Sequence, residues 1–113
     1  MTGQVNLFHF ADSVESRSSD WASVGITHEF RPPGESQHCP KPSASVKAKA
    51  PQAIGEFTVW VTGEAELEVI YVADAAQRAV HYELTNETLP SALDDFRQLL
   101  LNRPPDELLV HLE

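Results

Sequence analysis

The chain has 113 residues, the length of one domain, of which 42% are hydrophobic and 22% are charged. This balance is typical of a globular domain with its own core and excludes an intrinsically disordered or fibrous chain. The formal net charge of −9 at pH 7 argues against nucleic acid and against an anionic membrane surface as partners. The single cysteine, Cys39, excludes a disulfide framework and multi-cysteine zinc sites.

Neither a membrane span nor a secretory signal is predicted. No apolar run approaches the roughly 18 residues of a transmembrane helix. The first residues carry neither the basic segment nor the unbroken apolar segment of a signal peptide. We therefore expect a cytoplasmic protein with a single domain over residues 1–113. Its tail at 104–113 carries enough leucine and valine for a docked turn of helix or an edge strand.

The first half of the chain predicts one helix and two short strands. Apolar residues recur at helical spacing over residues 5–24, and Gly25 is well placed to end the helix. The segments 26–30 and 43–50 favour strands, the second because alanine and valine alternate with serine and lysine. The Pro-rich segment 31–42 between them is expected to be a surface loop.

The second half of the chain predicts a β-meander followed by a helix. Segments 56–62, 65–73 and 78–85 each alternate apolar and polar residues, with tight turns between them. A continuous apolar stripe predicts a helix over residues 89–101, with Thr88 as its N-cap. The short connections leave no room for parallel crossovers. The expected fold is therefore α+β: an antiparallel meander sheet of four to five strands with an N-terminal and a C-terminal helix packed on one face.

The alternation of residues also assigns the two faces of this sheet. The helices are expected to cover the apolar face, which carries Phe57, Val59, Val61, Leu67, Val69, Tyr71, Val80, Tyr82 and Leu84. The open face then carries the seven candidate partner-binding residues Thr58, Trp60, Glu66, Glu68, Ile70, His81 and Glu83. Trp60 beside Ile70 and within a rim of glutamates resembles the anchor of a protein interface, unless the loop or the tail covers Trp60.

The whole net charge of −9 lies in the second half of the chain. Residues 1–55 hold five acidic and five basic residues, whereas residues 56–113 hold twelve acidic residues and three arginines. The second half of the chain is therefore expected to form an acidic surface. Such a surface steers a basic partner.

Three open-face glutamates allow three interpretations. Glu66, Glu68 and Glu83 are close enough together for general acid–base catalysis of the glycosidase kind. An open sheet face, however, lacks the burial that separates an acid from a base in such chemistry. The second interpretation is a solvated face in which Lys47 and Lys49 are cross-strand partners of the glutamates. The third is a partner-binding face.

Neither a metal site, a cofactor site nor a catalytic nucleophile is predicted. His38 and Cys39 form the only adjacent pair of this kind, and no second pair stands at ligand spacing. Cys39 is followed by Pro40 rather than by a helix that would activate it. The chain has neither a G-x-S-x-G motif nor a Gly-rich phosphate loop.

Residues 42–70 carry a pattern that resembles a known family. Pro-Ser-Ala-Ser-Val at 42–46, Gly-Glu-Phe-Thr-Val-Trp at 55–60 and Gly-Glu-Ala-Glu-Leu-Glu-Val at 63–69 resemble the small bacterial immunity proteins of the TriTu type. The N-terminal helix and the segment 89–101 are similar in placement, so the likeness covers most of the chain. The Pro-rich segment 31–42 and the tail after Pro104 depart from the family pattern.

The resemblance implies a cytosolic, non-enzymatic antidote to a cognate toxin domain. In that family the toxin is an ADP-ribosyltransferase that modifies elongation factor Tu and stops translation. The first hypothesis is therefore an immunity protein that occludes the active site of such a toxin with its acidic sheet face. The alternatives are a small acidic enzyme that uses the three glutamates, and a chaperone or adaptor for a secreted effector. Self-association is left open by the sequence.

Overall fold

The computed structural model describes residues 5–33 and 42–110. Two helices, α1 (Leu7–Ser16) and α2 (Ser18–Ser23), precede the sheet, and helix α3 (Leu89–Leu101) and the 3-10 turn η1 (Asp106–Leu108) follow it. The sheet consists of β1 (Thr27–Arg31), β2 (Ser43–Lys49), β3 (Ala53–Trp60), β4 (Glu64–Tyr71) and β5 (Gln77–Glu83).

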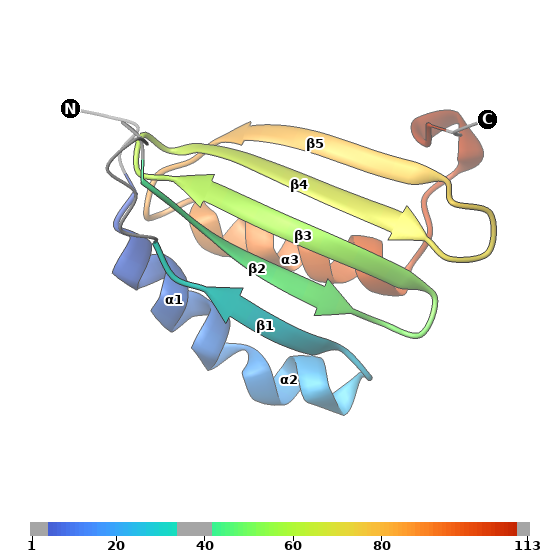
Figure 1. Ribbon diagram of the computed structural model, residues 1–113, viewed down its shortest axis with the longest axis horizontal. Coiled ribbons are helices and arrows are strands. Elements are labelled where there is room, and N and C mark those ends of the chain that lie inside the picture. Colours follow the sequence, from blue (N-terminus) through green and yellow to red (C-terminus); the bar gives the residue numbers. More distant parts are fainter. Residues whose placement is uncertain (1–4, 34–41, 111–113) are drawn as a thin grey trace.

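The five strands pair in the order of the sequence, and every neighbouring pair is antiparallel. Figure 1 shows the helices on one side of the sheet, with α1 and α2 beside β1, and α3 behind β3 and β4. Over the described ranges, no element covers the other side. The predicted α+β meander with helices on one face is therefore confirmed. None of the helices in these ranges is long and apolar enough to span a membrane.

The predicted N-terminal helix is divided in two. Helix α1 ends at Ser16 and α2 begins at Ser18, so that Arg17 separates them instead of continuing one helix over 5–24. The Ser16 hydroxyl donates to the Ser13 carbonyl, and the Ser18 hydroxyl donates to the Glu15 carbonyl, both at 2.9 Å. Serine hydroxyls that bond nearby carbonyls compete with the helix backbone. The serine-rich sequence therefore explains the break.

Strand β3 begins three residues earlier than predicted, because the turn before it is tighter. The Ala50 N–H donates to the Ala53 carbonyl at 2.8 Å, so only Pro51 and Gln52 lie in the loop. The predicted strands over 43–50 and 56–62 leave residues 51–55 between them as a connection. The correction moves Ile54 onto the open face of the sheet, where it becomes part of the candidate site.

Helix α3 has the predicted bounds, but its N-terminus is stabilised differently. Thr88 occupies the N-cap position, yet its side chain bonds none of the free N–H groups of the first turn. Its hydroxyl accepts the N–H of Thr85 at 2.8 Å instead. The prediction that the Thr88 side chain caps α3 is therefore wrong, and the hydroxyl stabilises the preceding turn.

Phe57 joins the two layers of the fold. Its ring centroid lies 5.9 Å from that of Phe10 on α1 and 5.8 Å from that of Phe96 on α3. The same ring lies 6.0 Å from the Tyr82 ring on β5. Phe10, Phe57 and Phe96 are fully buried. Because alternate residues of a strand point to opposite faces, burial of Phe57 places both of its neighbours in the sequence on the open face.

Gly55 lets α3 approach the middle of the sheet. A Cβ at this position would lie 2.6 Å from Cε1 of Phe96 and 3.2 Å from Cδ2 of Leu100. It would also lie 3.1 Å from the Glu68 carbonyl oxygen. Both helix side chains are buried and held by their neighbours, so there is no free space for the extra methyl group.

The tail after α3 returns to the sheet and supplies both of the predicted features, a helical turn and a strand-like contact. Val110 pairs with Gln77 at the edge of β5, with N–H to carbonyl distances of 2.7 and 2.8 Å. Leu109 is buried beneath it. Arg103 stabilises the return of the tail, because its guanidinium donates to both carboxylate oxygens of Asp74, at 3.0 and 2.7 Å. These hydrogen bonds raise the pKa of Arg103.

Replacing Gly55 by alanine tests the close approach of α3. We expect Gly55→Ala to lower the free energy of unfolding by about 1–3 kcal/mol, because the added methyl group overpacks the contact with Phe96. Urea unfolding followed by circular dichroism measures this. Ala79→Val, which adds methyl groups at an exposed strand position, is the control and should change stability by less than about 0.5 kcal/mol. Equal effects of the two substitutions would contradict the close packing.

Candidate functional site

The strand register places the candidate residues on the open face in rows that cross the sheet. In one row Glu66 lies opposite Thr58 on β3 and opposite His81 on β5. Nδ1 of His81 lies 3.9 Å from Oε1 of Glu66, and both side chains are more than half exposed. The two side chains form an ion pair only when the imidazole of His81 carries a proton.

Two further rows bring carboxylates of like charge together. Glu56 lies directly opposite Glu68, and Glu64 lies directly opposite Glu83. Like charges in direct register destabilise an antiparallel pair. The sequence-based site contained Glu68 and Glu83 but lacked their partners Glu56 and Glu64. The structure therefore concentrates more negative charge on this face than the sequence alone indicated.

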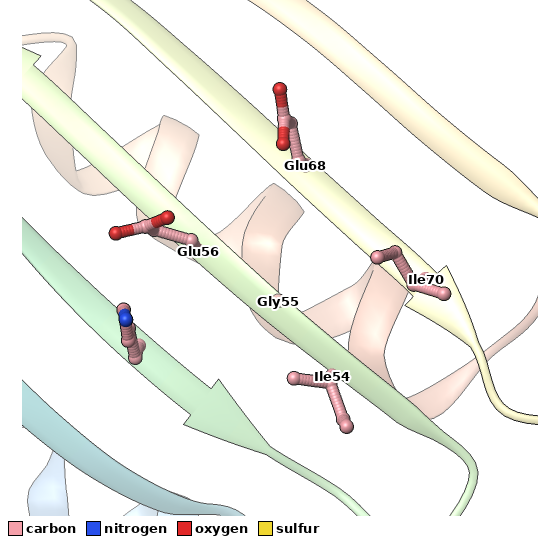
Figure 2. Close-up of a pocket in the computed structure, with 6 residues that line it drawn as sticks. Ile54, Gly55, Glu56, Glu68 and Ile70 are labelled. Carbon is pink, nitrogen blue, oxygen red and sulfur yellow. The ribbon is translucent and has the colours of Figure 1, made fainter.

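An apolar row lies next to these glutamates. Ile54 on β3 and Ile70 on β4 are direct partners, and 47% and 41% of their surfaces are exposed. They line a shallow hollow of about 250 Å³ together with Lys47, Glu56 and Glu68. Figure 2 shows the two isoleucines on one side of this hollow and the two carboxylates on the other.

The tail adds one apolar residue to this row, Val110, beyond the polar Gln77. Gln77 lies opposite Ile70, and Val110 in turn lies opposite Gln77, so all three point to the open face. Val110 is 61% exposed. The apolar tail predicted a docked segment but not its partner, because the contact joins two segments that are far apart in the chain.

Trp60 lies on the open face and is half-buried, so it is neither fully covered nor strongly exposed. It is the last residue of β3 and lies opposite Ser43 on β2. Its carbonyl accepts the N–H of Gly63 at 2.9 Å, which closes the turn to β4. Part of the indole is therefore accessible to a partner at the end of the face opposite to the isoleucines.

The open face is divided by charge. Its β3–β5 half carries Glu56, Glu64, Glu66, Glu68 and Glu83 and no lysine or arginine among the described positions. Its β1–β2 half carries Arg31, Lys47 and Lys49 with the single acidic residue Glu29. A partner that covers the whole face therefore meets a negative half and a smaller positive half.

The expected pairing of the lysines with the candidate glutamates is wrong. Lys47 lies between Glu29 and Glu56, and Lys49 lies opposite Ile54. Neither lysine is on a strand next to β4 or β5. Glu66, Glu68 and Glu83 therefore have no lysine as a direct cross-strand neighbour.

The described residues offer little for metal binding or catalysis. No group of three or more His, Cys, Asp or Glu side chains within the ranges 5–33 and 42–110 is arranged to hold a metal ion. His38 and Cys39 lie outside the described residues. Glu66, Glu68 and His81 line a second hollow, of about 340 Å³, but all three are exposed to solvent. Burial raises the pKa of Tyr82 to about 12, with a further contribution from Asp95, but this tyrosine lies on the helix side.

Comparison with known proteins gives one match. A protein-family model described as Immunity protein TriTu matches residues 8–99, which is most of the chain. No curated protein and no solved structure matches the chain significantly.

Removing one of two opposing glutamates tests whether repulsion between their carboxylates lowers the stability of the fold. We expect Glu68→Gln to raise the free energy of unfolding by roughly 0.2–1 kcal/mol, since Glu68 faces Glu56. The gain should shrink in high salt because salt screens exposed charges. Glu29→Gln is the matched control: Glu29 faces Lys47, so its loss should lower stability. Chemical unfolding at two salt concentrations measures both, and a loss of stability in Glu68→Gln would contradict the repulsion.

Proposed function

Because the chain belongs to the TriTu family of immunity proteins, we propose that it binds a cognate toxin domain and covers the active site of that toxin. The family supports an immunity function with a protein partner. Our proposal adds that the toxin is an ADP-ribosyltransferase acting on elongation factor Tu, and that neutralisation takes place in the cytoplasm. It assigns binding, without catalysis or a cofactor, to this chain.

The observation that carries the proposal is the composition of the open face. The β3–β5 half combines five glutamates with the exposed pair Ile54 and Ile70. Exposed charges of one sign steer an oppositely charged partner and raise the association rate. Apolar side chains inside a polar rim supply the anchors of an interface. Trp60 adds a large, partly accessible side chain at the other end of the face.

The acidic face is chemically matched to the active site of an enzyme that uses NAD. Such an enzyme holds the two phosphates of NAD with basic side chains and backbone N–H groups. A row of carboxylates that enters such a cleft competes for the same basic groups. Direct occlusion of the NAD site therefore fits the sign of the charge on this face.

The shape of the face supports binding over catalysis. Its hollows are shallow and its carboxylates are exposed or half-exposed, whereas general acid–base chemistry requires one carboxyl group in a water-excluded setting. A broad and slightly twisted sheet face suits a large protein partner better than a small substrate. The proposal therefore places Thr58, Trp60, Glu66, Glu68, Ile70, His81 and Glu83 in the toxin contact.

A charge-reversal pair tests the proposed face. The wild-type protein should bind the toxin domain encoded by the adjacent upstream gene one to one and block its ADP-ribosylation of elongation factor Tu. Glu66→Lys combined with Glu68→Lys should weaken binding at least about tenfold, mainly through a slower association rate. Calorimetry gives the affinity, and surface plasmon resonance at two salt concentrations gives the rates.

The matched control changes the same charge elsewhere. Glu15→Lys on α1 combined with Glu87→Lys before α3 alters the net charge equally at two exposed positions outside the open face. This control should retain nearly the affinity of the wild type. If both double variants weaken binding equally, the charge acts only through the whole molecule and the proposed face is wrong. If the wild type binds no toxin domain, the proposed function fails.

A further inference from the structure

Strand β5 forms one edge of the sheet (Figure 1). The hydrogen bonds of its first residue, Gln77, show which way the backbone groups along this edge point. In an antiparallel sheet, both backbone groups of a residue point to the same side, and the side alternates from one residue to the next. Gln77 exchanges both of its hydrogen bonds with Val110, so its groups point away from β4. The preceding Ala76 carbonyl accepts the N–H of Tyr71 at 2.9 Å and so points towards β4.

The other end of the strand confirms the same alternation. The Leu84 N–H donates to the Gly63 carbonyl at 2.7 Å, on the side of β4. The register between β4 and β5 is continuous from Gln77 to Glu83, without a bulge. The backbone groups of Ala79, His81 and Glu83 therefore point outwards like those of Gln77, and those of the residues between them point towards β4.

These outward groups are available to a partner. The tail approaches β5 in the antiparallel direction, so the residue opposite Ala79 would be Leu108. Leu108 instead ends η1, and its N–H donates to the Pro105 carbonyl at 2.9 Å. Within the described chain, the N–H and carbonyl groups of Ala79, His81 and Glu83 have no hydrogen-bond partner. An unpaired strand edge of this kind is a template for another strand.

The opposite edge of the sheet is flanked by helices. Figure 1 shows α1 and α2 beside β1. Trp21 of α2 packs against His28 with ring centroids 5.3 Å apart, and Phe10 of α1 packs against Phe30 at the same distance. In the described chain only the tail lies beside β5, and it pairs there with a single residue.

The side chains along β5 define the chemistry of a matching strand. His81 and Glu83 point to the open face, next to Glu66 and Glu64 on β4. Val80 and Tyr82 point to the helix side, where both are half-buried. A strand added to this edge would place alternate residues beside Ala79, His81 and Glu83, with the glutamates of β4 one strand further in. Its remaining residues would lie beside Val80 and Tyr82. Basic residues that alternate with apolar residues satisfy both sides.

We propose that the toxin domain contributes an extended segment with alternating basic and apolar residues, which pairs with Ala79, His81 and Glu83 as an additional strand of the sheet. The inference rests on the proposed function, because the partner is the same toxin domain. It adds to that function the part of the sheet, the edge of β5, at which the toxin domain is held. Backbone pairing sets the position of the toxin, and the glutamates then select basic side chains.

A second copy of this chain is a poorer occupant of the edge. Each chain carries a net charge of −9, so two copies that meet at this edge repel each other. A basic toxin segment meets no such repulsion. The net charge of the chain therefore favours a different protein over self-association.

Hydrogen exchange of the wild-type protein tests the edge directly. In the free protein, the amides of Ala79, His81 and Glu83 should exchange rapidly, whereas those of Val80 and Tyr82 should be protected by β4. Bound toxin domain should slow exchange of the first three at least about tenfold. Residue-resolved exchange followed by nuclear magnetic resonance distinguishes the two sets without any substitution.

A proline substitution supplies an independent measurement. Ala79→Pro removes an N–H that points away from β4, and edge strands accept proline at such positions. We expect the variant to bind the toxin domain roughly tenfold more weakly, because a carbonyl of the toxin loses its partner. Ala79→Ser keeps the N–H and should bind like the wild type. Circular dichroism and thermal unfolding check that both variants fold.

The outcomes separate this inference from the proposed function. If the complex forms and neutralises the toxin, but the amides of Ala79, His81 and Glu83 exchange as in the free protein, strand addition is overturned and the immunity function stands. Protection of these amides that grows with protein concentration in the absence of toxin would also overturn it, in favour of a second copy. If no complex forms, both proposals fail.

Discussion

Burial of Phe57 between the sheet and two helices is the constraint on which the rest of the structure depends. Its ring contacts those of Phe10 and Phe96, and this fixes which face of β3 is covered. Since side chains alternate along a strand, Glu56 and Thr58 must then lie on the open face. The antiparallel register then places the partners of these residues on β4 and β5 on the same open face. Burial of one aromatic side chain thus determines on which face of the sheet the glutamates lie.

The open face keeps a charge pattern that folding alone does not favour. Opposing glutamates, such as Glu56 and Glu68, cost stability, while the covered face is well packed and supplies the folding energy. Departures from locally favourable pairing are common at functional sites. The same face carries exposed isoleucines and ends at a strand edge with backbone groups that no described residue pairs. Charge, apolar anchors and backbone edge together form one surface suited to a basic protein partner.

Local patterns predicted much of this fold, and contacts distant in the sequence account for what they missed. The helix at 89–101 and the faces of β4 and β5 follow from periodicity alone. The predicted strand over 56–62 leaves out Gly55, which is a strand residue that makes room for α3. Because the predicted strand began at residue 56, Ile54 was left out of the predicted site. Register decided that Lys47 faces Glu56, and tail docking brought Val110 to the face; neither has a local signature.

The most direct test of the account uses the two tryptophans as internal probes of the complex. Trp60 is half-buried on the open face, whereas Trp21 has no exposed surface and lies in the core. Titration of the toxin domain into the labelled protein, followed by the two indole N–H signals in nuclear magnetic resonance spectra, distinguishes them. We expect the Trp60 signal to shift in proportion to complex formation while the Trp21 signal stays in place. A complex that leaves the Trp60 signal unmoved would contradict the claim that this face binds the toxin.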